Sequence, residues 1–236
     1  MERSMIYLFD VDGTLTPSRG KMDEEFSKFF FDFCNLNDVY LVTGSDKPKT
    51  VEQIGNVIYG MSKRVYNCSG NEVWEDSRLV RVNDWKLPDL ARSFLINCEY
   101  ESQFNIRTGN HIEERSGMVN FSVVGRNASL ADRAKYVEYD TKENERNTIA
   151  NAFNMMFPDL EARPGGETGL DIAPKGLDKS QILVDFANVS DILFFGDRMD
   201  EGGNDYPLAS ALDKIKNGCN RPVKNWQHTW EQLKNL

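Results

Sequence analysis

The amino-acid sequence predicts an α/β fold, with a Rossmann-like core around a parallel sheet and an inserted α+β domain around an antiparallel sheet. Two short apolar runs near the start, and a third near the end, each stop abruptly at a polar loop. Such runs are typical of strands buried on both faces of a parallel sheet. Between them lies a stretch where apolar and polar residues alternate, as in an antiparallel strand with one exposed face.

The first half of the core is predicted from three consecutive segments. Met5–Phe9 is an apolar run that ends at Asp10–Thr14, so we expect a buried strand followed by a loop. A helix is predicted over residues 23–35, because Phe26, Phe29, Phe30 and Phe33 have helical spacing and would form one apolar face. Val39–Val42 is a second apolar run that ends at a polar loop, Thr43–Asp46. Strand, helix and strand begin a doubly wound sheet.

The middle of the chain has a different pattern. Residues 81–89 are expected to be irregular. Val119, Phe121 and Val123 alternate with polar residues, which predicts a half-exposed antiparallel strand. One helix is expected to begin near Ser129 and a second near Asp140, where Glu143 would complete a capping box. Residues 170–172 are expected to form another strand of this domain.

After Pro174 the pattern of the core returns. Ile182, Leu183 and Phe186 are expected on a helix, and 191–195 is an apolar strand that leads into Gly196 and Asp197. The chain is therefore expected to divide into a first part of the core at 1–81, an inserted domain at 82–174 and a second part of the core at 175–236.

Composition restricts the class of protein. A formal net charge of −9 over 236 residues argues against a nucleic-acid partner, which would require dense Lys and Arg. The four cysteines are too scattered for a metal or redox motif and are expected to be buried thiols of a reducing compartment: Cys34, Cys68, Cys98 and Cys219. The sequence contains neither a signal-peptide pattern nor an apolar stretch of membrane-spanning length, so we expect a cytoplasmic protein with no membrane partner.

Three acidic residues are expected to meet at one edge of the sheet. Asp10 and Asp12 follow the first strand at a spacing of two, and Asp197 follows the last apolar strand. Carboxylates gathered in this way would repel each other unless a cation lay between them, and hard oxygen ligands favour Mg²⁺. A calcium loop of the EF-hand type is excluded because Leu15 and Lys21 occupy the positions that need glycine and glutamate.

This arrangement suits phosphoryl transfer through a covalent intermediate. One carboxylate would attack phosphorus and form an aspartyl-phosphate, while Mg²⁺ neutralises charge on the phosphoryl oxygens. Asp12 would give a proton to the leaving oxygen and remove one from the acceptor.

The motifs, taken together, resemble those of the haloacid dehalogenase (HAD) superfamily. Asp10-Val11-Asp12-Gly13-Thr14 is similar to its nucleophile motif. Thr43 and Ser45 fall where its second motif supplies a hydroxyl group to the phosphate. Lys179 falls where the third motif supplies a cation, and Gly196-Asp197 resembles the fourth. The resemblance implies a HAD core with an inserted cap domain.

Within that superfamily, nearly the whole chain resembles the eukaryotic-type phosphomannomutases. The segments that carry this resemblance are Pro17–Arg19, His111–Ser122 with Gly125-Arg126, Arg133, and the metal loop Phe194–Tyr206. The resemblance implies catalytic roles for Asp10, Asp12 and Lys179. It implies metal ligation by Asp10, Asp12, Asp197, Asn204 and Asp205. It implies substrate binding by Arg19, Thr43, Ser45, Arg115, Arg126, Arg133, Gly169 and Asp171.

The implied activity is interconversion of mannose 6-phosphate and mannose 1-phosphate, with Mg²⁺ as cofactor and hexose 1,6-bisphosphate as activator. A mutase must hold a sugar with two phosphates, and arginine forks on the inserted domain would bind the distal one. The resemblance also implies a phosphorylated sugar as partner, a homodimer formed through the cap domain and a place in GDP-mannose biosynthesis.

Two further functions stay open at this level. A sugar-phosphate phosphatase on the same scaffold would use the same aspartates, with water in place of the sugar. A catalytically silent binding protein is disfavoured by the intact Asp10, Asp12, Lys179 and Asp197. Two positions depart from the family pattern: Gly169 stands where a serine is usual, and Arg198-Met199 stands where lysine-threonine is common.

Overall fold

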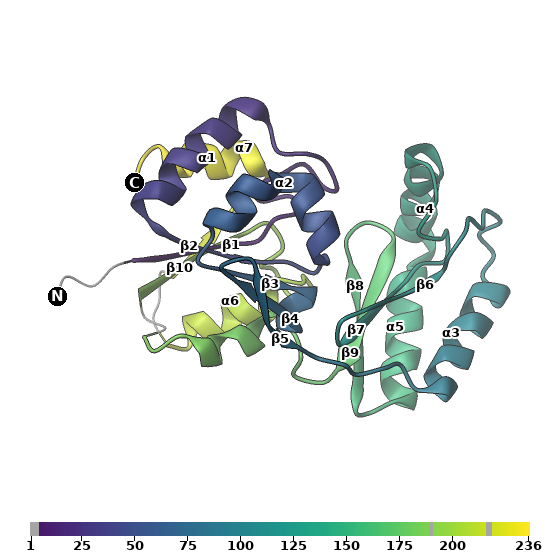
Figure 1. Cartoon of the computed structure of the whole chain (residues 1–236). Helices are drawn as coiled ribbons and strands as arrows, with labels where there is room; N and C mark the ends of the chain where they lie inside the picture. The colour runs from purple at the N-terminus through teal and green to yellow at the C-terminus, as the bar shows by residue number, and fades with distance from the viewer. Residues whose placement is uncertain (1–4, 189–190, 216–218) are drawn as a thin grey trace. The chain divides into compact units, whose positions relative to one another are not determined.

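The computed structural model describes residues 5–188, 191–215 and 219–236. The chain forms two compact units (Figure 1). The first, which we call the core unit, comprises Met1–Asn83 and Leu177–Leu236. The second, which we call the cap unit, comprises Asp84–Gly176. Each unit has its own sheet and its own apolar core.

The core unit is built on a sheet that contains seven strands within the described ranges, in the order β11-β10-β1-β2-β3-β4-β5. The strands are β1 (Ile6–Phe9), β2 (Asp38–Val42), β3 (Arg64–Asn67), β4 (Glu72–Glu75), β5 (Arg78–Val82), β10 (Ile192–Gly196) and β11 (Asn220–Pro222). From β11 to β3 every pairing is parallel, and β3, β4 and β5 pair antiparallel. The mostly parallel α/β sheet predicted from the sequence is confirmed.

Helices cover both faces of this sheet (Figure 1). They are α1 (Glu24–Leu36), α2 (Lys47–Met61), α6 (Tyr206–Asp213) and α7 (Trp226–Leu233), with the short 3-10 helices η1 (Cys68–Gly70) and η2 (Lys179–Asp185). Phe9 packs in the cluster beneath α1, α2 and α7, whereas its neighbour Leu8 packs in the cluster that contains residues of α6 and η2. Successive residues of β1 therefore face opposite layers, which explains why the strand is apolar throughout.

Helix α1 forms as the phenylalanine spacing predicts. The Asp23 carboxylate accepts hydrogen bonds from the backbone N–H groups of Glu25 and Phe26, and so caps the first turn. Phe26 and Phe30 are fully buried and face the sheet. The expectation for 182–186 needs correction: Ile182 and Leu183 lie in the 3-10 helix η2, and Phe186 follows its end.

The cap unit contains, in its described residues, an antiparallel sheet in the order β6-β7-β9-β8. Its strands are β6 (Ile112–Arg115), β7 (Met118–Phe121), β8 (Leu160–Gly165) and β9 (Gly169–Pro174). Its helices are α3 (Asp89–Glu101), α4 (Leu130–Glu143) and α5 (Glu145–Met156). Apolar residues from these helices and from alternate strand positions form one buried cluster. The predicted α+β unit with an antiparallel sheet is confirmed.

Strand β7 is buried on both faces, so the prediction that one of its faces is exposed was wrong. Val119 and Phe121 point into the apolar cluster as the alternation predicts. Asn120 faces the other way but is only 4% exposed, because its register partners Glu113 and Asp171 flank it on neighbouring strands. This row of polar side chains covers the face of the sheet opposite the apolar cluster.

The helix expected near Asp140 begins later. Helix α4 starts at its predicted cap, Ser129, and continues to Glu143. Asn144 then adopts a left-handed conformation with φ 53°, which ends α4 and allows α5 to start at Glu145. The Asp140 carboxylate accepts a hydrogen bond from the backbone N–H of Arg146 and forms an ion pair with the Arg146 guanidinium. Asp140 therefore caps α5 from inside the preceding helix.

The segment expected to be irregular, 81–89, is shorter than predicted. Arg81 and Val82 belong to β5, and Asp89 is the first residue of α3. Within the described residues, the helices are all too short or too polar to span a membrane.

Candidate active site

Two strand ends place carboxylates side by side in the core unit. Asp10 follows β1 and Asp197 follows β10, and these strands pair in parallel with Phe9 opposite Phe195. The backbone N–H of Asp10 continues this pairing by donating to the Phe195 carbonyl at 2.9 Å. The third carboxylate belongs to Asp205, immediately before α6. One oxygen from each of the three lies within 4.8 Å of the others.

Lys179 is the cation of this cluster. It is 1% exposed, and its Nζ donates to Asp10 Oδ1 at 2.5 Å and to Asp205 Oδ1 at 2.7 Å. Burial alone would lower the pKa of Lys179, but the two carboxylates raise it above its ordinary value. The lysine is therefore charged and fixes the position of Asp10.

The cluster carries more negative charge than Lys179 balances. Burial raises the pKa of Asp10 well above its ordinary value. The charge of Lys179 opposes this shift, and the charges of Asp205 and Asp197 add to it. Burial and the charge of Asp205 raise the pKa of Asp197 to about 6. Asp10 Oδ2 is buried and has no hydrogen-bond partner among the described residues. A buried carboxylate oxygen without a partner fits a metal ligand, so these three aspartates could hold a metal ion.

Gly13 is required by the approach of Asp197. Its φ is +84°, a conformation that other residues rarely adopt. A Cβ at this position would lie 2.4 Å from Asp197 Oδ2. The glycine at position 13 therefore allows the loop after β1 to pass close to the Asp197 carboxylate.

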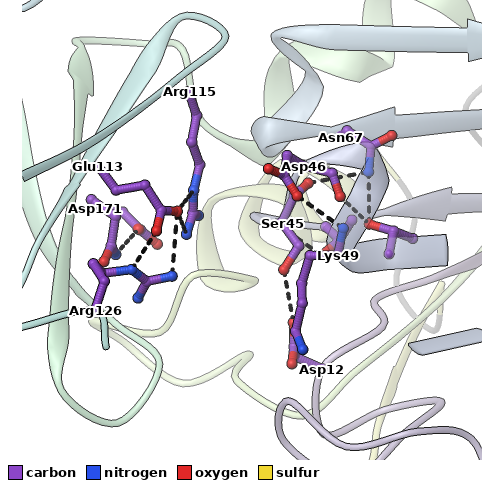
Figure 2. Close-up of polar contacts among 12 residues, drawn as sticks. Asp12, Ser45, Asp46, Lys49, Asn67, Glu113, Arg115, Arg126 and Asp171 are labelled. Carbon is purple, nitrogen blue, oxygen red and sulfur yellow. Dashed lines mark hydrogen bonds and ion pairs between the residues drawn. The ribbon is translucent and has the colours of Figure 1, made fainter. Parts of the chain in front are cut away.

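The Asp12 carboxylate lies outside this cluster of three. Its Oδ1 accepts from the backbone N–H of Arg19 at 2.8 Å and from Gln53 Nε2 at 2.9 Å. Its Oδ2 accepts from the Ser45 hydroxyl at 3.2 Å (Figure 2). The two aspartates of the motif thus have different surroundings, with Asp10 against a buried lysine and Asp12 against neutral donors.

The loop after β2 is fixed by its own hydrogen bonds. Thr43 Oγ1 accepts from the backbone N–H of Ser45 at 3.1 Å. The Ser45 carbonyl accepts from Asn67 Nδ2 at 3.1 Å, and Asp46 caps α2 by accepting from the backbone N–H of Lys49 (Figure 2). These bonds hold Ser45 in the position from which its hydroxyl reaches Asp12.

Two further predicted residues of the core unit border this site. Arg19 is half-buried with a left-handed φ of 57°, and Lys49 Nζ donates to its carbonyl at 3.3 Å. Asn204 is half-buried in the loop just before Asp205.

In the cap unit, two of the predicted arginines converge on one carboxylate. Glu113 accepts from Arg126 Nε at 2.7 Å and from Arg115 Nε at 2.7 Å (Figure 2). Burial alone would raise the pKa of Glu113, but the hydrogen bond from Arg126 and the charge of Arg115 hold it below its ordinary value. The predicted Asp171 instead accepts from Asn120 Nδ2 at 2.7 Å.

Arg133 is buried rather than paired on the surface. It is 4% exposed, and its Nε and Nη1 have no hydrogen-bond partner among the described residues. Its Nη2 lies 4.0 Å from the Glu167 carboxylate. A buried guanidinium with two unmade hydrogen bonds is unfavourable by itself, and this indicates a site for an anion.

Gly169 leaves space that a neighbouring side chain fills. A Cβ at this position would lie 2.8 Å from Asn120 Nδ2. A serine here would require the Asn120 amide to move, because contacts this short do not occur in folded proteins.

Three polar residues of these sites were not predicted from the sequence. Gln53 and Asn120 contact predicted residues directly, and Glu113 holds two of them. Glu113 and Asn120 lie inside the segment that resembles the family, but their residue types gave no specific role. Gln53 lies in α2, a helix for which the sequence pattern gave no prediction, so no signal pointed to it.

Solved structures of sugar-phosphate phosphatases share the fold of this chain. A trehalose-6-phosphate phosphatase C-terminal domain of C. albicans superposes with a TM-score of 0.67 at 14% identity, covering 98% of this chain and 91% of that one. A HAD subclass IIB sugar phosphatase superposes with a TM-score of 0.60 at 12% identity, covering 98% of each chain. The chain therefore has the fold of these sugar-phosphate phosphatases, with strand-end aspartates beside a buried lysine.

Sequence comparison gives the family of this chain. The model of the family described as eukaryotic phosphomannomutase matches residues 26–235. Phosphomannomutase of Encephalitozoon cuniculi is 32% identical over 100% of this chain and 96% of its own. Phosphomannomutase of Saccharomyces cerevisiae is 36% identical over 86% of this chain and 84% of its own. The chain therefore belongs to the eukaryotic phosphomannomutase family.

Proposed function

We propose that this protein is a magnesium-dependent phosphomannomutase that interconverts mannose 6-phosphate and mannose 1-phosphate. The observation that carries the proposal is the buried cluster of Asp10, Lys179 and Asp205, in which one oxygen of Asp10 has no partner. In a chain of this family, that arrangement supports the assignment of Asp10 as a nucleophile that is held in place beside a cation site.

Asp10 would attack phosphorus and form an aspartyl-phosphate, which divides a slow transfer into two faster steps. Lys179 holds Asp10 in place and offsets part of its charge. Thr43 and Ser45 would orient the phosphoryl group, and Asp12 would give a proton to the leaving sugar oxygen. Mg²⁺ would neutralise charge on the phosphoryl oxygens. Its proposed ligands are the clustered Asp10, Asp197 and Asp205, together with Asn204 and Asp12.

The cap unit would bind the second phosphate of the sugar. Arg115 and Arg126 are held by Glu113 at one edge of each guanidinium, and Arg133 has two buried N–H groups unpaired among the described residues. Within the cap unit, Asp171 and the backbone N–H of Gly169 would complete the contacts to this phosphate. Within the core unit, Arg19 is also a proposed substrate-binding residue. Hexose 1,6-bisphosphate would prime Asp10, because the cycle starts only when the enzyme or the sugar carries an extra phosphate.

The surroundings of the protein are part of the proposal. The proposed partner is a phosphorylated sugar, which the family membership supports, and the proposed setting is cytoplasmic. A net charge of −9 argues against a nucleic-acid partner. A homodimer through the cap domain is supported by large apolar residues that α3, α4 and α5 leave exposed: Leu90, Ile96, Tyr100, Leu130, Met155 and Met156. Residues 82–174 are the proposed cap domain, inserted between core segments 1–81 and 175–236.

The activity is tested by incubating the protein with Mg²⁺, mannose 1-phosphate and a trace of hexose 1,6-bisphosphate. Phosphorus NMR follows the sugar phosphates and inorganic phosphate in the same sample. Mannose 6-phosphate is the expected product. Release of inorganic phosphate without isomerisation would contradict the proposal and favour the sugar-phosphate phosphatase.

Mg²⁺ is expected to stabilise the protein against heat. A ligand that binds only the folded state adds about 2.7 kcal/mol at 100 times its dissociation constant. Asp197→Asn removes one carboxylate of the cluster and is expected to abolish most of the rise in melting temperature, measured by scanning calorimetry. Asp32→Asn, which changes an exposed aspartate of α1, is the matched control. An equal rise in both variants would contradict the assignment of the metal site.

Arg133→Met is expected to raise the KM for mannose 1-phosphate by about 10- to 100-fold, since hydrogen bonds to charged groups contribute about 1.5–3 kcal/mol. Stability should change little, because the buried guanidinium has two unmade hydrogen bonds among the described residues. Arg107 is the contrasting control, because its guanidinium donates to the carbonyls of Glu99 and Ser102 at 2.8 and 3.1 Å. Arg107→Met is expected to lower the melting temperature and leave KM unchanged. The reverse pattern would exclude Arg133 from phosphate binding.

A further inference from the structure

Gln53 is a buried side chain of α2 whose contacts centre on Asp12. It is 2% exposed, and its Nε2 lies 2.9 Å from Asp12 Oδ1 and 3.2 Å from Thr16 Oγ1. Its Oε1 is also buried and has no hydrogen-bond partner among the described residues. Its backbone carbonyl accepts from the backbone N–H of Met22 at 2.8 Å, which anchors this part of the helix.

The orientation of the Gln53 amide follows from its neighbours. The Thr16 hydroxyl donates to the Val11 carbonyl, so it receives a hydrogen bond from Gln53. A carboxylate oxygen of Asp12 also accepts. Both neighbours therefore require the amide nitrogen, and the opposite orientation would place Oε1 against the carboxylate.

An orphaned Oε1 is unfavourable for folding. A buried acceptor without a partner costs about 1–3 kcal/mol, and an apolar side chain of similar length would avoid this cost. We therefore expect the N–H group of Gln53 to have a role that offsets the cost of the unpaired Oε1. Asp12 is the one ionisable side chain that receives it among the described contacts.

The two oxygens of Asp12 have different partners. Oδ1 accepts from Gln53 Nε2 and from the backbone N–H of Arg19, and neither group is able to accept in return. Oδ2 meets only the Ser45 hydroxyl in the described contacts, and a hydroxyl donates or accepts by rotation. A proton on Oδ2 therefore leaves every one of these hydrogen bonds intact, whereas a proton on Oδ1 would break one.

We propose that Gln53 is a positioning residue for phosphoryl transfer: it fixes the rotation of the Asp12 carboxylate so that Oδ2 exchanges the proton with the sugar oxygen. This inference rests on the proposed role of Asp12. As the bond between phosphorus and the sugar oxygen breaks, a bond from Asp10 to phosphorus forms, and the proton of Oδ2 passes to the leaving oxygen. In the reverse step Oδ2 takes the proton of the accepting hydroxyl.

The test compares leaving groups that need the proton with one that does not. The rate of a single phosphorylation of the enzyme is measured by rapid quench with hexose 1,6-bisphosphate and with 4-nitrophenyl phosphate. Gln53→Met is expected to slow reaction with the bisphosphate at least about 10-fold, because general acid catalysis contributes about 10²- to 10⁴-fold. Reaction with the nitrophenyl ester is expected to stay within about twofold, since its leaving group departs without a proton.

Two further variants keep the result interpretable. Gln53→Glu preserves the size of the side chain but removes the N–H donor, and the same selective loss is expected. Gln232→Met removes a side-chain amide that donates to the Pro222 carbonyl and has no described contact with Asp12, and both rates should stay unchanged. Equal slowing of both esters by the Gln53 variants, or slowing of neither, would overturn the proposal. If both esters phosphorylate the wild-type protein but no mannose 6-phosphate is formed, the mutase function is overturned. The proposed role of Gln53 is not affected by that result.

Discussion

Replacing Asp10 by asparagine is expected to reduce isomerisation of mannose 1-phosphate by at least about 10⁴-fold, as removal of a covalent nucleophile does in other enzymes. Asparagine has the same shape but forms no acyl phosphate. The side chain is 1% exposed and lies against two other carboxylates, so the neutral amide relieves repulsion in the protein without metal. The melting temperature in EDTA is therefore expected to stay constant or to rise.

Phosphorus NMR with trace hexose 1,6-bisphosphate measures the activity, and calorimetry measures the melting temperature. Asp32→Asn, on the exposed side of α1, is expected to match the wild type in both. An Asp10→Asn variant that retained one hundredth of the activity would exclude Asp10 as the nucleophile. A large fall in melting temperature would mean that the carboxylate is structural.

Lys179→Met is expected to have the largest effect on stability. Lys179 is the cation that contacts Asp10 and Asp205, at 2.5 and 2.7 Å, and all three side chains are buried. Removing one member of a buried ion pair leaves an uncompensated charge and destabilises by about 3–5 kcal/mol. We expect a loss of this size at neutral pH in EDTA, measured by urea unfolding. Lys135→Met removes an exposed pair with Asp132 and should change stability by less than about 1 kcal/mol.

The loss of unfolding free energy caused by Lys179→Met should become smaller as the pH falls. Burial raises the pKa of Asp10 in the folded state even with the lysine present, and loss of the lysine raises it further. An acid whose pKa is raised by folding contributes most stability below its unfolded pKa and loses it as the pH rises through its folded pKa. The difference between variant and wild type should therefore decrease from pH 7 toward pH 4. A deficit that grows over this range would contradict the charge cluster.

The core elements that position the site follow from sequence because their residue patterns are clear. Strands β1, β2 and β10 are apolar runs that end in polar loops, and the structure places them as neighbours. Helix α1 has both a capping aspartate and a phenylalanine stripe. By contrast, β7 was expected to be half-exposed, because the sequence does not reveal that Glu113 and Asp171 enclose Asn120.

Local signals failed where tertiary contacts decide the outcome. Asp140 and Glu143 have the spacing of a capping box, yet Asp140 caps α5 through Arg146 while lying inside α4. Lys179 was recognised by its motif position, but its complete burial between two carboxylates follows only from the fold. Gln53 belongs to no motif, since its contact with Asp12 joins residues 41 positions apart in the chain.

Trapping the phosphorylated protein tests the central claim most directly. The protein is incubated with Mg²⁺ and hexose 1,6-bisphosphate, quenched, and treated with borohydride, which reduces an aspartyl-phosphate to homoserine. Peptide mass spectrometry then locates the modified residue. We predict homoserine at position 10, dependent on Mg²⁺. Reduction at a different aspartate, or at none while mannose 6-phosphate is still formed, would contradict a mechanism through Asp10.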